Sequence, residues 1–137
     1  MKPRLFALIG SLILAMTAAT SNAQTTDSEN TLYLDLDHGR VVIELLPEVA
    51  PNHVSRVKEL AREGFYDDIV FHRVLDGFMA QSGDPTGTGG GGSDKPDLKA
   101  EFSDTPFVRG TIGAARTNNP HSANSQFFIV FQPASHL

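Results

Sequence analysis

Apolar residues at alternate positions are the feature that most limits what this chain can fold into. In the segment 31–36, Thr-Leu-Tyr-Leu-Asp-Leu, leucine occupies every second position, which is the period of a strand that buries one face. His38-Gly39 then predicts a turn, and the apolar segment 41–46 predicts a returning strand that ends before Pro47. A hairpin of this kind needs a second layer to cover its apolar face.

Short strands also dominate the rest of the chain. Strand-type composition recurs in the segments 69–75, 78–81, 111–115 and 126–131. One segment has the period of a helix instead, because apolar residues recur at helical spacing after Pro51 and Gly64 is the expected C-terminal cap. The outer face of this helix is predicted from the charged residues Arg56, Lys58, Glu59 and Arg62. The predicted fold is therefore mostly β and antiparallel, a sandwich or a barrel, with at least one packed helix.

The first residues have the pattern of an export signal. Lys2 and Arg4 precede an apolar run from Leu5 to Ala19, and Ser21-Asn22-Ala23 places small residues at the cleavage positions. The run has about 15 residues, fewer than the ~20 that cross a bilayer as a helix. We therefore predict a cleaved signal peptide over residues 1–23 and no stable membrane insertion after cleavage; an uncleaved membrane anchor is the alternative.

The rest of the chain suits one domain. Residues 24–30 are polar and predict a disordered lead-in, and residues 31–137 supply the apolar content of one core. Acidic residues outnumber basic ones by 16 to 11, which disfavours a nucleic-acid partner because phosphates require a basic surface. Cysteine is absent, so disulfides and thiolate chemistry are excluded. The five histidines show no paired ligand spacing, and no metal site is predicted.

Two motifs narrow the fold further. The segment 71–84, Phe-His-Arg-Val-Leu-Asp-Gly-Phe-Met-Ala-Gln-Ser-Gly-Asp, places a guanidinium, an amide and large apolar side chains along a strand-like run, and the segment 125–129 reads Ser-Gln-Phe-Phe-Ile. In this order the motifs resemble those of the cyclophilin family of peptidyl-prolyl cis-trans isomerases, from about Thr31 to the last residue. The resemblance implies an antiparallel eight-stranded barrel with two capping helices. It also implies that the chain stops at Leu137 before the final strands and the second helix.

The activity implied by this resemblance is rotation about an X–Pro peptide bond. The barrier is about 18–20 kcal/mol because the nitrogen lone pair is delocalised into the carbonyl group. A catalyst needs an apolar pocket for the proline ring and a hydrogen-bond donor aimed at the prolyl nitrogen, which stabilises the twisted transition state. No bond is broken, so the resemblance implies no cofactor and no metal.

The resemblance assigns a role to each of several side chains. Arg73 is the expected catalytic residue, because a guanidinium stays charged and offers several donors in one plane. Substrate binding is expected from Phe78, Met79, Gln81, Thr117, Phe128 and Leu137. Rings and a thioether suit a proline ring, whereas Thr117 lies in a segment that binds the substrate backbone through main-chain groups. Adjacent strand residues face opposite sides, so one of Phe127 and Phe128 can lie in the core and the other in the pocket. The resemblance implies that Phe128 is the pocket residue and Phe127 the core residue.

The glycine-rich segment 87–92 has some likeness to a phosphate-binding loop. No Gly-Lys-Ser/Thr sequence follows it, so the phosphate-loop signal is weak. We predict a flexible loop beside the pocket instead.

Together these features predict an exported isomerase, periplasmic or secreted, that assists protein folding. Its expected partners are unfolded or folding polypeptides with X–Pro bonds, and it is expected to be a monomer. The alternative is a non-catalytic proline-peptide binding module or holding chaperone that uses the same groove. Arg73 discriminates between them, because a binding module needs no donor at the prolyl nitrogen.

Overall fold

The computed structural model describes residues 27–137, so the predicted signal peptide and residues 24–26 lie outside the described part. In chain order its elements are the 3-10 helix η1 (Ser28–Asn30), β1 (Thr31–Leu36), β2 (Gly39–Glu44), α1 (Pro51–Arg62), β3 (Arg73–Leu75), β4 (Met79–Ser82), β5 (Ile112–Ala114) and β6 (Phe127–Val130). Each predicted strand segment overlaps one of these strands, although β2 begins two residues before the predicted 41–46 and β4 ends one residue after the predicted 78–81; the predicted helix is α1.

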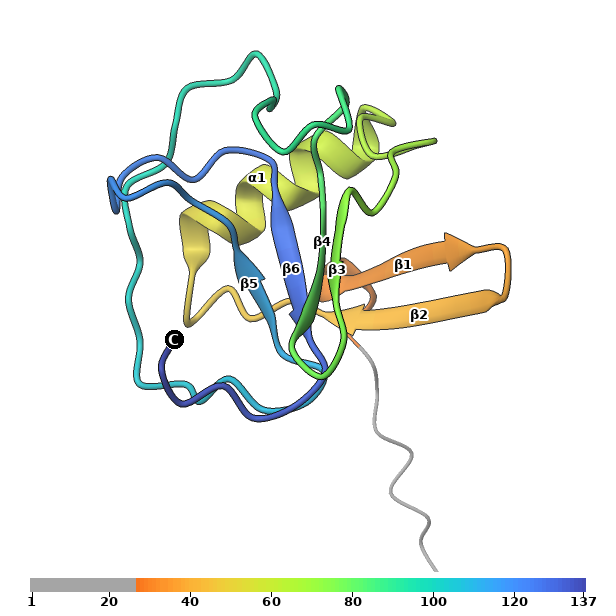
Figure 1. The fold of residues 1–137 in the computed structure, drawn as a ribbon. Helices are drawn as coiled ribbons and strands as arrows, with labels where there is room; N and C mark the ends of the chain where they lie inside the picture. The colour runs from red at the N-terminus through yellow and green to blue at the C-terminus, as the bar shows by residue number, and fades with distance from the viewer. Residues whose placement is uncertain (1–26) are drawn as a thin grey trace, which may run out of the picture.

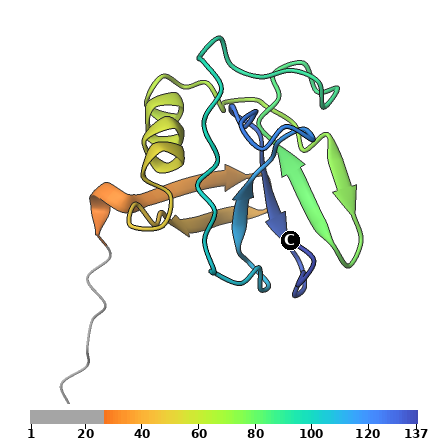
Figure 2. The same ribbon diagram turned by 90° about the vertical axis from the view of Figure 1, so that its left-hand side faces the viewer.

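The strands form two antiparallel sheets (Figure 1). Strands β1 and β2 make a hairpin, and the second sheet has the order β3-β4-β6-β5. Figure 2 shows α1 and the hairpin on the same side of this second sheet. No strand pairing joins the two sheets within residues 27–137. The fold class predicted from the sequence, mostly β and antiparallel with an unclosed barrel, is confirmed.

Helix α1 receives its N-terminal cap from a distant part of the chain. Ala50, at the capping position, makes no side-chain hydrogen bond to the helix. The carboxylate of Glu101, in the long segment between β4 and β5, accepts from the backbone N–H of Asn52 at 3.0 Å and of His53 at 3.1 Å. His53 Nδ1 also lies 2.6 Å from Glu101 Oε2. This cluster attaches the β4–β5 segment to the start of the helix.

The prediction that Arg56 lies on the outer face of the helix is wrong. Arg56 is only 9% exposed, and its Nη2 donates to the carbonyl oxygen of Pro96 at 2.9 Å. The β4–β5 segment passes over this side of α1, which the helical period alone does not reveal. The predicted end of the helix is confirmed, since Gly64 has a φ of 70°, a conformation that favours glycine.

The predicted strand 69–75 is shorter than expected, because only Arg73–Leu75 forms β3. Strand β3 lies at the edge of the sheet and, within residues 27–137, pairs only with β4, which ends at Ser82. Gly83 then has a φ of 90° and turns the chain away. Residues before Arg73 therefore lose their backbone partner, and Ser82 Oγ donates to the Val70 carbonyl oxygen at 3.0 Å instead.

Residues 27–30, which belong to the predicted lead-in 24–30, form η1 and its N-terminal cap. Asp27 caps η1 by accepting from the N–H of Glu29 at 3.0 Å. Arg62, on the last turn of α1, donates to Glu29 Oε1 at 2.7 Å. A polar composition predicts disorder only when the polar groups find no partners in the fold, and these groups find them on the helix.

The larger buried apolar side chains lie in two places. Val54 and Leu60 are buried on α1, and Met79, Val130 and Ala134 form a separate cluster beside the four-stranded sheet. The second cluster is the one on which the candidate site is built. Among residues 27–137, no helix combines the length and the apolar character that a membrane crossing requires.

Candidate functional site

Strand register brings the predicted residues Arg73, Gln81 and Phe128 into one row. Arg73 pairs with Gln81 between β3 and β4, and Gln81 pairs with Phe128 between β4 and β6. Directly paired residues of antiparallel strands project to the same face. A guanidinium, an amide and an aromatic ring therefore follow one another across the sheet, and Arg73 Nη1 donates to Gln81 Oε1 at 3.3 Å.

The row ends on a glycine that makes room for the ring. Gly113 of β5 pairs with Phe128, and a Cβ at this position would lie 2.6 Å from Phe128 Cζ and 2.7 Å from Phe107 Cε1. The two rings stack, with centroids 5.6 Å apart and an interplanar angle of 21°. Gly113 therefore leaves room for the stacked rings of Phe128 and Phe107.

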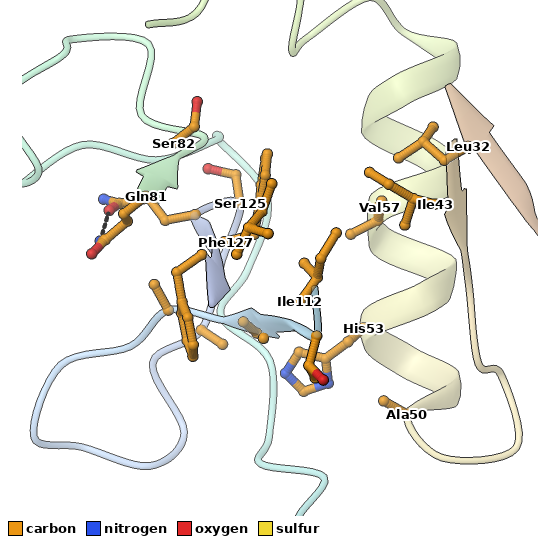
Figure 3. Close-up of a pocket in the computed structure, with 18 of the residues that line it drawn as sticks. Leu32, Ile43, Ala50, His53, Val57, Gln81, Ser82, Ile112, Ser125 and Phe127 are labelled. Carbon is orange, nitrogen blue, oxygen red and sulfur yellow. Dashed lines mark hydrogen bonds between the residues drawn. The ribbon is translucent and has the colours of Figure 1, made fainter. Parts of the chain in front are cut away.

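Phe127 faces the other side of β6, as the alternation of the strand predicts. Its ring makes edge contacts with the rings of Tyr66 and Phe71, whose centroids lie 5.8 Å and 6.3 Å from its own. On that side, between the sheet and α1, Figure 3 shows the apolar side chains of Leu32, Ile43, Val57 and Ile112 gathered around one space. The structure thus separates a core-facing Phe127 from a groove-facing Phe128.

The apolar part of the site is a floor with rings around it. Met79 is only 2% exposed and packs with Val130 and Ala134, and the rings of Phe78 and Phe128 lie against this cluster. Met79 therefore lies beneath the surface of the site, whereas the two half-buried rings border it. The predicted pocket residues are brought together, with different depths.

Leu137 lies at the rim of this region. Its side chain and main chain are 54% exposed, and its N–H donates to the Ala134 carbonyl oxygen at 3.1 Å. The neighbouring His136 ring lies 5.5 Å from the Phe78 ring, centroid to centroid. The residues that line the large hollow of the molecule, which also extends between the sheet and α1, include all of the predicted site residues, which are Arg73, Phe78, Met79, Gln81, Thr117, Phe128 and Leu137.

Thr117 is the predicted residue whose geometry fits its role least directly. Its N–H donates to Ser122 Oγ at 2.9 Å, and its carbonyl oxygen accepts from Arg116 Nη1 at 2.9 Å. Both main-chain groups are therefore already engaged inside their own turn. A substrate backbone would have to replace one of these bonds.

The glycine-rich loop is ordered by a buried carboxylate, not flexible as predicted. Asp84 is 1% exposed, and its oxygens accept from the backbone N–H groups of Thr86, Thr88, Gly89 and Gly91 at 2.6 to 3.1 Å. Burial alone would raise the pKa of the Asp84 carboxyl; the hydrogen bonds from Thr86, Gly91 and Gly89 outweigh it and hold the pKa well below its usual range. The N–H groups that a phosphate would need are thus occupied by the protein's own carboxylate.

Gln126 connects this loop to the row of site residues. Its Nε2 donates to the carbonyl oxygens of Gly89 at 3.0 Å and Gly91 at 2.7 Å, and its Oε1 accepts from Gln81 Nε2 at 2.8 Å. Sequence reasoning did not assign a role to Gln126, Asp84, Phe107 or Gly113. Gln126 and Asp84 do lie within the two motifs, and their polar side chains inside strand-like runs were an available signal.

The site therefore combines one fixed charge with an apolar floor. Arg73 is exposed, and the one hydrogen bond of its side chain within residues 27–137 is the long one to Gln81, so most of the guanidinium donors are free to meet another molecule. The arrangement suits a ligand with a small apolar ring next to an amide group. In the same part of the chain, no group of three or more His, Cys, Asp or Glu side chains could hold a metal ion.

Comparison with known sequences identifies a family. The family model for cyclophilin type peptidyl-prolyl cis-trans isomerase/CLD matches residues 31–137. A probable peptidyl-prolyl cis-trans isomerase from Brucella suis biovar 1 is 51% identical over 130 residues, which cover 87% of this chain and 66% of the relative. Peptidyl-prolyl cis-trans isomerase B of Bacillus subtilis is 42% identical over 103 residues, covering 74% of this chain and 71% of that protein. This chain therefore spans just under two thirds of the length of the Brucella relative.

Solved structures show the same fold. A cyclophilin from Hirschia baltica superposes with a TM-score of 0.74 at 28% identity, covering 82% of this chain and 61% of that one. A cyclophilin type isomerase from Cryptosporidium parvum, solved in the presence of the dipeptide Ala-Pro, also has a TM-score of 0.74 at 28% identity and covers 78% of this chain and 71% of its own.

Proposed function

This chain belongs to the family of cyclophilin type peptidyl-prolyl cis-trans isomerases, and from that premise we propose that the protein accelerates rotation about X–Pro peptide bonds. Its substrates are unfolded or folding polypeptides, so that it assists protein folding. The Cryptosporidium relative was solved in the presence of the dipeptide Ala-Pro, which supports a proline-containing substrate. The reaction breaks no covalent bond, and the proposal requires no cofactor.

A single observation carries the proposal: the Arg73 guanidinium lies in register with Gln81, at the edge of an apolar floor. A proline ring resting on Phe78 and Phe128, above Met79, would bring its nitrogen toward Arg73. A hydrogen bond to that nitrogen localises the lone pair and restores single-bond character in the twisted state. An acceleration of 10⁵-fold would require about 7 kcal/mol from such effects.

The remaining predicted residues take supporting roles. Gln81 has a second amide hydrogen that can donate to a substrate carbonyl group while the first stays bonded to Gln126. Leu137 covers the proline ring from the rim. Thr117 binds the substrate backbone after giving up its bond to Ser122 or to Arg116.

The proposed site of action rests on the predicted signal peptide. We propose that residues 1–23 direct export, and that the mature protein works as a monomer in the periplasm or outside the cell. The acidic excess of 16 Asp and Glu over 11 Lys and Arg supports a polypeptide client over a nucleic acid.

The experiment compares Arg73→Ala with the unsubstituted protein on a proline-containing peptide. We expect the isomerisation rate, measured by NMR exchange spectroscopy, to fall about a hundredfold or more, while the peptide Kd changes little, because the bond to the prolyl nitrogen strengthens only as that nitrogen pyramidalises. Arg62→Ala, on α1, is the matched control. Equal losses of binding and turnover would instead indicate a proline-peptide binding module or holding chaperone.

A further inference from the structure

We propose that Gln126 is a positioning residue that determines which atom of the Gln81 amide faces Arg73. Hydrogen bonds to the glycine-rich loop fix the orientation of Gln126 itself. The inference rests on the proposed function, because it concerns how the same Arg73 is held. Gln126 would touch neither the prolyl nitrogen nor the rotating bond, and it acts through Gln81.

The direction of the hydrogen bonds carries the argument. An amide side chain has a donor end and an acceptor end of nearly the same shape, and either can occupy one place. The carbonyl oxygens of Gly89 and Gly91 can only accept, so they require the Nε2 end of Gln126, at 3.0 and 2.7 Å. The Oε1 end of Gln126 must then face Gln81.

The orientation of Gln126 in turn fixes the orientation of Gln81. Because Gln126 presents an acceptor, Gln81 must present its Nε2, at 2.8 Å. The Oε1 of Gln81 is then left for Arg73 Nη1, at 3.3 Å. A guanidinium has donors and no acceptor, so a flipped Gln81 would point a donor at a donor and push Arg73 away.

The glycine-rich loop can orient Gln126 because the loop backbone is itself held in place by hydrogen bonds to Asp84. The Asp84 carboxylate accepts from four backbone N–H groups between Thr86 and Gly91. A Cβ on Gly91 would collide with Asp84 Oδ1, so the loop approaches the carboxylate as closely as a chain without a side chain allows. The carbonyl groups of Gly89 and Gly91 are therefore fixed in direction.

A double-mutant cycle with the full chain tests the proposal. Gln126→Met keeps the size of the side chain and removes both ends of its amide. With Gln81 intact, we expect kcat/KM to fall about three- to tenfold, the range that the loss of one hydrogen bond produces, at a nearly constant peptide Kd. In Gln81→Glu, both carboxylate oxygens are acceptors and no flip exists, so Gln126→Met should then cost less than twofold. A similar fold-loss in both backgrounds would overturn the proposal.

Two further measurements keep the result interpretable. Gln132→Met, at an exposed glutamine outside the network, is the matched control in both backgrounds. The NMR signals of the Gln81 side-chain amide and of Arg73 Nε–H should shift in Gln126→Met and stay in place in Gln132→Met; unmoved signals in Gln126→Met would also contradict the proposal. If Gln126→Met does not fold, Gln126→Ala is used in its place. An inactive parent protein would refute the proposed function, while the NMR comparison would still decide whether Gln126 orients Gln81.

Discussion

At the scale of single residues, the shape of the groove depends on the missing side chain of Gly113 as much as on the aromatic rings beside it. Gly113 has no side chain where a Cβ would meet two rings, and the stacked pair Phe128 and Phe107 occupies that space. A close contact with ring atoms cannot be relieved by a small rotation, because both rings are packed against the Met79 cluster. The identity of this residue therefore determines the shape of the pocket.

We expect Gly113→Ala to destabilise the protein by about 1–3 kcal/mol, the usual cost of overpacking, and to weaken binding of a proline-containing peptide. Chemical denaturation and peptide titration measure the two effects. Gly90→Ala is the matched control, since a Cβ there meets only Thr88 Oγ1, at 3.7 Å. Unchanged stability and affinity in Gly113→Ala would mean that the rings move without cost.

At the scale of elements, the β4–β5 segment is attached to α1 through Glu101. Burial alone would raise the pKa of the Glu101 carboxyl; the hydrogen bonds from His53 and Asn52 outweigh it and lower the pKa to about 2 from the usual 4.5. A carboxyl whose pKa is lower in the folded state stabilises the fold above its unfolded pKa. That stabilisation is lost as the pH falls from about 4.5 toward 2.

Glu101→Gln should therefore flatten the acid side of the stability profile. Between pH 6 and pH 3 the unsubstituted protein is expected to lose about 2 kcal/mol of unfolding free energy through this group alone, a part that the variant lacks. Urea denaturation at the two pH values measures the difference. Glu48→Gln, at an exposed glutamate, should behave like the parent, and an equal pH dependence in Glu101→Gln would refute the role of this carboxylate.

Local patterns predicted the elements well and their long-range partners poorly. The period-two leucines of 31–36 and the helical spacing after Pro51 depend only on neighbouring residues, and both elements formed as predicted. The burial of Arg56 and the capping by Glu101 depend on where the β4–β5 segment crosses the helix, which no local period encodes. For the site, the row Arg73, Gln81, Phe128 followed from family resemblance, whereas the link through Gln126 requires the observed register.

At the scale of the whole molecule, β6 has different neighbours on its two faces. Phe128 faces the groove with Arg73 and Gln81, and Phe127 faces the space shared with α1 and the hairpin. One strand thus supports both the site and the packing behind it.

The predicted signal peptide over residues 1–23 also concerns the whole molecule. Expressed in a bacterial host, the protein is expected to mature to an N-terminus at Gln24, because Ser21-Asn22-Ala23 follows the apolar run. Intact-mass measurement of the exported fraction tests this, and Ala23→Arg, which places a large charge at the cleavage position, should block processing. A membrane-extracted species that retains Met1 would support the anchor alternative.

Because the loop backbone is hydrogen-bonded to the Asp84 carboxylate, few amino-acid substitutions in this surface loop should be tolerated during evolution. Glutamate is one methylene longer and asparagine exchanges an acceptor for a donor, so neither substitute satisfies the same backbone N–H groups. Gly87 and Gly89 have φ values of 68° and 87°, which other residues adopt at a cost, and Gly91 has no room for a Cβ. A surface loop can therefore be as intolerant of substitution as a core, so intolerance in this loop would not by itself mark a contact with substrate.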